Sequence, residues 1–281
     1  MLNYCRLSAV FLISVGLLAC SLQPAEANPE SNDPSGGCHD SLNVVILGDS
    51  NAWIGGDNCD QPKGWNTWFR ERFAPATCKS YARSGATWTH STETRRNTEQ
   101  NIAVLGNDNV VYNQIERLKE AFDKGQQPSP HLILIAAGTN DAWFSEKRPA
   151  IYSQTVSHVF AQTDGFSTKQ TASQVISLAA CVRYNCELLM QYFPECQIIL
   201  LTPPQTTATT TDRINRVSDV IEACANRMSI GVIRLDHEAC NYDIRERQNK
   251  LFTTDGTHSS EKGARRNGYY IANQVSHMLQ Y

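Results

Sequence analysis

Four short runs of almost uninterrupted apolar residues constrain the fold of this chain more than any other feature of its sequence. They cover residues 43–47, 132–137, 197–202 and 230–235, and residues 77–81 form a weaker, more polar candidate. Continuous Val, Ile and Leu, without alternation of apolar and polar residues, is typical of strands that are buried on both faces. We therefore expect a parallel sheet that is covered by helices on both sides.

The segments that separate these runs have helical periodicity, and strand and helix alternate five times. Alternation of this kind favours right-handed crossovers and a layered α/β architecture. We predict a three-layer α/β/α sandwich, flavodoxin-like in its organisation, around a five-stranded parallel sheet. A chain of 281 residues that is 41% hydrophobic and 19% charged is consistent with one globular domain. The predicted helices cover residues 64–73, 110–124, 171–193, 212–227 and 259–279.

Three connections do not belong to this minimal pattern. Residues 86–109 and 143–170 are long and rich in polar and aromatic side chains, and residues 203–211 are rich in threonine. Long connections in a compact domain are usually functional, and ligands of open parallel sheets bind beyond the carboxyl ends of the strands. We expect these three loops to emerge at that edge.

The N-terminal residues predict export. Residues 1–19 contain one charged side chain, Arg6, and a short apolar core, as in a signal peptide. The sequence Leu17-Leu18-Ala19-Cys20 is similar to a bacterial lipobox, which predicts lipidation of Cys20; an ordinary secretory signal with a chance cysteine is the alternative. Residues 20–40 have the composition of a flexible tether, and residues 41–281 form the predicted domain. We expect an exported lipoprotein of a bacterium, anchored in the membrane and facing the periplasm or the cell surface.

Cysteine content and charge narrow the functional classes. The formal net charge of −3 provides no basic surface for nucleic acid. An even number of cysteines in an exported domain favours disulfides, with unknown pairing, over buried free thiols. No Cys-x-x-Cys pair is present, so we expect no metal site. Apart from Cys20, the cysteines of the predicted tether and domain are Cys38, Cys59, Cys78, Cys181, Cys186, Cys196, Cys224 and Cys240.

A serine stands where the first apolar run ends, in Gly48-Asp49-Ser50-Asn51, and a histidine follows an aspartate in Asp255-Gly256-Thr257-His258. Ser50 alone is equally well explained as a helix cap. A serine hydroxyl becomes a nucleophile when an imidazole accepts its proton, and a carboxylate on the second ring nitrogen orients that base. Asp255 lies three residues before His258 and is able to turn back to it. The pair predicts a base and its orienting acid.

Two further blocks contain candidate donors for an oxyanion. Asn140 lies in Gly138-Thr139-Asn140-Asp141, after the most apolar run, and its amide could stabilise the charge that develops during ester hydrolysis. An Asx turn that closes the strand is the alternative. Gly85 follows the second run, and a glycine there lets a backbone N–H approach the same oxygen closely. A simple turn glycine is the alternative for Gly85.

These four blocks, in this order, resemble the SGNH hydrolases, also called the GDSL esterase and lipase family. The resemblance implies that Ser50 is the nucleophile, His258 the base and Asp255 its orienting acid. It also implies an oxyanion hole made by the backbone N–H groups of Ser50 and Gly85 and the side chain of Asn140. The sequence departs from the family pattern at Asn51, where the family name has leucine, and in the second block, which lacks the family's asparagine.

The resemblance implies a serine esterase that needs no cofactor and hydrolyses carboxylic esters through an acyl-enzyme. Export, polar loops and tryptophans near the motifs favour deacetylation of carbohydrate, with Trp143 lining the substrate. A lipase or lysophospholipase, a non-catalytic carbohydrate-binding surface lipoprotein, and acyl transfer to an alcohol other than water are the alternatives. Small esters or acetylated carbohydrates are the expected substrates, and the membrane is contacted through the lipid on Cys20.

Overall fold

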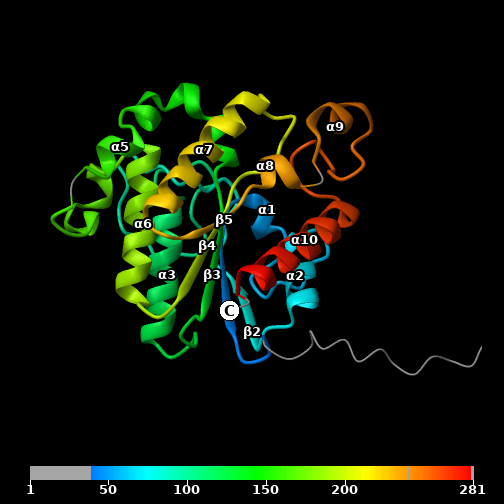
Figure 1. Ribbon diagram of the computed structural model, residues 1–281, viewed down its shortest axis with the longest axis horizontal. Helices are drawn as coiled ribbons and strands as arrows, with labels where there is room; N and C mark the ends of the chain where they lie inside the picture. Colours follow the sequence, from blue (N-terminus) through cyan, green and yellow to red (C-terminus); the bar gives the residue numbers. More distant parts are fainter. Residues whose placement is uncertain (1–38, 162, 240, 280–281) are drawn as a thin grey trace, which may run out of the picture. The chain divides into compact units, whose positions relative to one another are not determined.

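A five-stranded parallel sheet forms the centre of the protein. The computed structural model describes residues 39–161, 163–239 and 241–279. The strand order is β2-β1-β3-β4-β5, and every neighbouring pair is parallel. The predicted three-layer sandwich is thereby confirmed, since helices cover both faces of the sheet (Figure 1). The strands are β1 (Asn43–Gly48), β2 (Thr77–Ser80), β3 (Leu132–Ala136), β4 (Gln197–Leu201) and β5 (Gly231–Ile233).

Alternate residues of each central strand enter two separate cores. Val45 and Leu47 of β1 pack with helices α3, α6 and α7, whereas Val44 and Ile46 pack with α2 and α10 on the other face. All four side chains are fully buried. Both faces of the strand therefore require apolar residues, which explains why β1 reads as a continuous apolar run. The long helices are α2 (Trp65–Phe73), α3 (Val111–Asp123), α6 (Leu178–Tyr192), α7 (Thr211–Arg227) and α10 (Glu261–Leu279).

Short helices occupy the connections. α1 and α4 follow the first and third strands directly, and neither was predicted as a separate helix. The connection 143–170 consists mostly of single turns, and α8 and α9 precede the last helix. The short helices are α1 (Ser50–Trp53), α4 (Thr139–Trp143), α5 (Val156–Val159), α8 (Leu235–Glu238), α9 (Asp243–Asn249), and the 3₁₀ turns η1 (Ser145–Lys147), η2 (Pro149–Tyr152), η3 (Ser167–Lys169) and η4 (Ala172–Gln174).

One predicted helix begins later than expected. The periodicity predicts a helix over residues 171–193, but α6 begins at Leu178. Thr171 and Gln174 form a capping box around the single turn η4, and Ser177 then caps α6 by accepting a hydrogen bond from the backbone N–H of Ala180. Two successive caps divide the segment because each cap residue adopts an extended backbone.

The two long connections are linked to each other. Arg148, in the connection 143–170, donates hydrogen bonds to the hydroxyl of Thr87 at 3.0 Å and to the carbonyl of Thr89 at 3.2 Å. Both threonines belong to the connection 86–109 and are buried.

Within the described residues, no helix has the length and apolar character needed to cross a bilayer.

The six described cysteines are free thiols, so the expected disulfides are not confirmed. Five of the six are buried, and Cys196 is half-buried. Cys20, Cys38 and Cys240 lie outside the described residues.

Candidate active site

Ser50 is held at the start of α1 by the close approach of β1 and β3. The backbone N–H of Asp49 donates to the carbonyl of Ala136 at 3.0 Å. A Cβ on Gly48 would lie 2.3 Å from that same carbonyl oxygen, so only glycine allows the two strand ends to meet. The Asp49 side chain then caps α1 by accepting from the backbone N–H of Asn51 at 3.0 Å. Ser50 is therefore the first helical residue after the strand.

The imidazole of His258 joins Ser50 to Asp255. His258 Nε2 lies 2.9 Å from Ser50 Oγ, and His258 Nδ1 lies 2.7 Å from Asp255 Oδ2. The other carboxylate oxygen, Asp255 Oδ1, accepts from the backbone N–H groups of Thr257 at 2.9 Å and His258 at 2.8 Å. These contacts fix the carboxylate against the ring. The structure thus brings together all three residues predicted as the triad.

The loop that carries His258 is supported by the threonine-rich connection 203–211. Thr207 donates its backbone N–H to the carbonyl of Gly256 at 2.9 Å, and the hydroxyls of Thr206 and Thr257 lie 2.6 Å apart. Gly256 has φ +93°, and a Cβ there would lie 1.8 Å from the Thr207 hydroxyl oxygen. Only glycine therefore fits at position 256. Through these contacts the connection 203–211 holds the loop that carries His258.

The second and third sequence blocks are also in direct contact. Asn140 Nδ2 donates to the carbonyl of Ala86, the residue after Gly85, at 3.0 Å. This bond uses one of the two amide hydrogens of Asn140 and leaves the other for a ligand. Gly85 has φ +80°, and a Cβ there would lie 2.2 Å from the carbonyl oxygen of Val104. Among the described residues, no acceptor is hydrogen-bonded to the backbone N–H of Ser50 or of Gly85.

Two buried side chains that the sequence reading missed hold these blocks in place. Asp141 is fully buried and accepts from the backbone N–H groups of Trp88 at 2.9 Å and Thr89 at 3.0 Å. Gln114 of α3 is also fully buried and makes two 2.8 Å hydrogen bonds with Gly48, one with its N–H and one with its carbonyl. A glutamine on the apolar face of a predicted helix was the available signal for this second contact.

The carboxyl groups of the site differ in electrostatic environment. Burial raises the pKa of Asp49 to about 6, although its hydrogen bond from the Asn51 backbone opposes the shift. Burial acts in the same direction on Asp255, but hydrogen bonds from His258 and the Thr257 backbone outweigh it and hold the pKa of Asp255 below its ordinary value. Asp255 therefore carries the negative charge that pairs with the imidazole.

Two exposed tryptophans lie on the short helices that begin at the site. Trp143, predicted to line the substrate, is 44% exposed and is three residues beyond Asn140 on α4. Trp53 is 45% exposed and is three residues beyond Ser50 on α1. Trp65 is buried, whereas Trp68 is only half-buried. Within the described residues, no group of three or more His, Cys, Asp or Glu side chains is arranged to hold a metal ion.

Comparison with known proteins identifies the family. The model of the GDSL-like lipase/acylhydrolase family matches residues 46–266. The chain belongs to this family. The match begins in β1, just before Ser50, and extends into α10, beyond His258, so this GDSL-like hydrolase contains all four motif blocks within the family domain. The family is one of ester hydrolases.

Solved structures show the same fold. A protein of Bacteroides uniformis named as a GDSL-like lipase has a TM-score of 0.53 and 19% identity, over 85% of this chain and 95% of its own. A GDSL-like lipase of Bacteroides ovatus has a TM-score of 0.53 and 16% identity, over 84% and 98%. A carbohydrate acetylesterase of Sinorhizobium meliloti has a TM-score of 0.51 and 15% identity, over 85% and 100%. No curated protein matches the sequence of this GDSL-like hydrolase.

Proposed function

We propose that this GDSL-like hydrolase is a serine esterase that forms an acyl-enzyme on Ser50 and removes acetyl groups from carbohydrate. The observation that carries the proposal is the continuous contact from Asp255 through His258 to Ser50, with distances of 2.7 Å and 2.9 Å. A hydroxyl in contact with an oriented imidazole is the arrangement that nucleophilic acyl transfer requires.

The proposed reaction proceeds in two steps, acylation and deacylation of Ser50. His258 Nε2 accepts the proton of Ser50 Oγ as that oxygen attacks the ester carbonyl carbon, and the imidazolium is stabilised by Asp255. The bond to the alcohol breaks, and the alcohol oxygen takes the proton from His258. Water then gives a proton to His258 and attacks the acyl carbon. The bond between that carbon and Ser50 Oγ breaks, His258 returns the proton to Ser50 Oγ, and the carboxylic acid leaves.

The donors proposed for the oxyanion are the Ser50 and Gly85 backbone N–H groups and the second amide hydrogen of Asn140. This assignment is supported because neither of the two backbone N–H groups has a hydrogen-bond partner among the described residues. The Asn140–Ala86 hydrogen bond also joins the segments that contain the second and third donors. Donors held by backbone contacts need no rearrangement when negative charge develops, which is the main source of their catalytic effect.

Two exposed tryptophans favour carbohydrate as the substrate class. Trp53 is the last residue of α1, the helix that begins with Ser50, and its indole ring is exposed. Trp143 is the last residue of α4, the helix that contains Asn140, and its ring is exposed as well. Large, rigid aromatic surfaces with a polar edge suit contact with sugar rings. The fold that this chain shares with the carbohydrate acetylesterase of Sinorhizobium meliloti agrees with this choice.

A lipase-type activity on longer acyl chains is the second candidate. Val104 and Leu105 are 55% and 69% exposed, and the backbone of Val104 packs against Gly85. Apolar side chains beside a donor of the proposed oxyanion hole would favour an extended acyl chain.

A panel of p-nitrophenyl acetate, butyrate and octanoate, together with acetylated oligosaccharide, tests both candidates. We expect the highest kcat/KM on acetate, release of acetate from the oligosaccharide, and loss of at least about 10³-fold in kcat for Ser50→Ala. Activity that rises steeply toward octanoate would favour the lipase. A fluorophosphonate probe that labels wild type and Ser50→Ala equally would favour the non-catalytic binder.

We also propose that the protein is an exported lipoprotein, anchored through Cys20. The support is the sequence Leu17-Leu18-Ala19-Cys20, which lies outside the described residues. Fractionation of cells that express wild type and Cys20→Ala tests the anchor. Wild type is expected in the membrane fraction and the variant in the soluble fraction, and equal distribution would refute lipidation at Cys20.

A further inference from the structure

Two cysteines from different segments meet beside the edge of the sheet. Cys59 lies in the loop between α1 and α2, and Cys78 lies on the edge strand β2. Their Sγ atoms are 3.5 Å apart, and the residues are only 1% and 6% exposed. A small movement of either side chain would bring the sulfurs to bonding distance.

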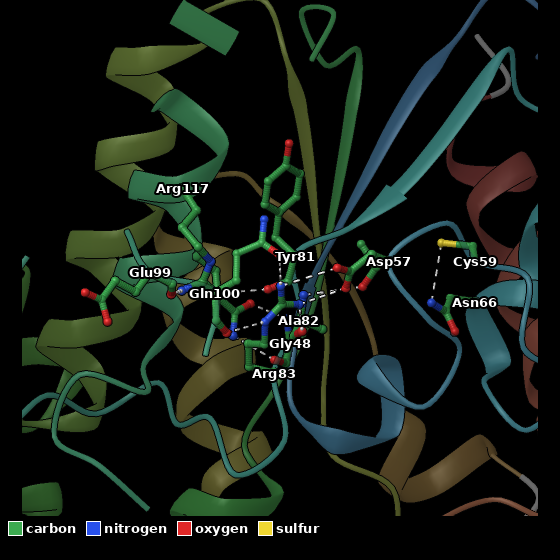
Figure 2. Close-up of polar contacts among 12 residues, drawn as sticks. Gly48, Asp57, Cys59, Asn66, Tyr81, Ala82, Arg83, Glu99, Gln100 and Arg117 are labelled. Carbon is green, nitrogen blue, oxygen red and sulfur yellow. Dashed lines mark hydrogen bonds and ion pairs between the residues drawn. The ribbon is translucent and has the colours of Figure 1, made fainter. Parts of the chain in front are cut away.

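The loop holds Cys59 in position over Cys78. The Asn66 side chain, which is fully buried, donates to Cys59 Sγ at 3.4 Å (Figure 2). The carbonyl of Gly55 accepts from the backbone N–H groups of Asp60 at 2.9 Å and Gln61 at 3.0 Å, which closes the loop. Cys59 itself has φ +54°, a conformation that a residue other than glycine adopts only when its surroundings enforce it. The two thiols are therefore in contact because the fold places them there.

The contacts of other described cysteines are different. Cys181 donates to the carbonyl of Val175 at 3.1 Å, Cys196 to that of Gln197 at 3.4 Å, and Cys224 to that of Ala179 at 3.7 Å. Among the described residues, Cys59 and Cys78 make the one hydrogen bond in which both atoms are sulfur. Geometry thus selects one pair from the many that the cysteine count allows.

We propose that Cys59 and Cys78 form a disulfide in the oxidised protein. One thiolate attacks the disulfide of a small-molecule or protein oxidant, and the second thiolate displaces the oxidant from the mixed disulfide. The two cysteines lose two protons and two electrons, and the oxidant leaves as two thiols.

The buried bridge acts as a structural staple. The hydrogen bond with Cys59 and, to a lesser extent, burial raise the pKa of the Cys78 thiol. Thiolate is consequently scarce once the pair is buried, and oxidants have little access to it. Oxidation during folding, while both side chains still reach solvent, avoids both obstacles.

The stapled loop also contains one partner of an ion pair near the site. Asp57 pairs with Arg83 at 2.8 Å, and Arg83 also donates to Gln100 (Figure 2). Arg83 lies two residues before Gly85, and its backbone N–H donates to the carbonyl of Gly48 at 3.1 Å. A staple at Cys59 would thus hold Asp57 where it pairs with the segment leading to Gly85. The disulfide does not depend on the proposed esterase activity.

Peptide mapping tests the bridge in the wild-type protein. The full chain is folded in a buffer of oxidised and reduced glutathione, denatured, alkylated without reductant, and cleaved before Asp and after Lys and Arg. Cleavage leaves Cys59 in the peptide 57–59 and Cys78 in the peptide 73–79, each free of other cysteines. We expect these peptides to be joined, and separated by reductant. Alkylation of both Cys59 and Cys78 would overturn the proposal.

Thermal unfolding provides a second, independent measurement. A bridge that closes a loop of about 20 residues predicts that reductant lowers the Tm of wild type by roughly 6–12 °C. Cys78→Ala should lose this response, and the matched control Cys196→Ala should keep it. A full response in Cys78→Ala would assign the effect to other cysteines and refute the pair.

Discussion

Replacement of Asp49 by asparagine should change how the stability of the protein depends on pH. Asp49 is 2% exposed, and burial raises its pKa to about 6 from an ordinary value of 3.8. The folded protein therefore holds this proton more tightly than the unfolded chain does. Stability contributed by the protonated carboxyl is present below about pH 4 and is lost as the pH rises to about 6. Asparagine has no such proton and still accepts the capping hydrogen bond from Asn51.

The magnitude follows from the difference between the two pKa values. About two pKa units correspond to about 3 kcal/mol in the free energy of unfolding. From pH 4 to pH 7, the stability of wild type relative to Asp49→Asn should fall by up to about this amount. Urea unfolding followed by tryptophan fluorescence at four pH values measures the change. Asp123→Asn is the matched control, because the Asp123 side chain is 53% exposed. Parallel curves for wild type and Asp49→Asn would refute the buried, protonated carboxyl.

Three substitutions test the groups assigned to the reaction. Asp255→Asn replaces the acceptor of the His258 ring with an amide and should lower kcat by about 10²- to 10⁴-fold, measured with p-nitrophenyl acetate; an unchanged kcat would remove Asp255 from the triad. Asn140→Ala should lower kcat by about 10²- to 10³-fold with little change in KM, and normal turnover would show that its amide does not contact the oxyanion. Gly85→Ala should lower kcat by a similar factor, because a Cβ 2.2 Å from the Val104 carbonyl forces the backbone to move. Gly125→Ala is its control, since Gly125 also has positive φ (+69°) but has no atom within 4 Å of the added Cβ; equal losses in the two variants would indicate a general folding defect.

The sheet could be predicted because its determinants are local in sequence. Each central strand is buried on both faces, and burial of this kind requires the continuous apolar residues from which the strands were recognised. The proposed triad could be predicted for the same reason, since Ser50 follows a strand and Asp255 and His258 are three residues apart. Their contact depends on the carboxyl ends of parallel strands lying at one edge.

The supporting contacts could not be predicted because they join distant segments. Gln114 reaches Gly48 across 66 residues, and Asp141 reaches Trp88 across 53. Neither side chain has a neighbour in sequence that reveals its partner. The sequence pattern also made one helix too long, because Ser177 interrupts a segment whose apolar periodicity continues across it.

The packing of the last helix has a consequence for when activity can appear during biosynthesis. His258 lies three residues before the start of α10, and α10 lies against α2, with Gly268 close enough that a Cβ would lie 2.3 Å from the Trp65 carbonyl. Ser50 is near one end of the described chain and His258 near the other. A ribosome-bound chain that lacks α10 cannot pack this helix against α2, so the loop that carries His258 has no anchor on its C-terminal side. Under the proposed mechanism, ester turnover requires α10 to be packed in place, and it can serve as a probe of folding.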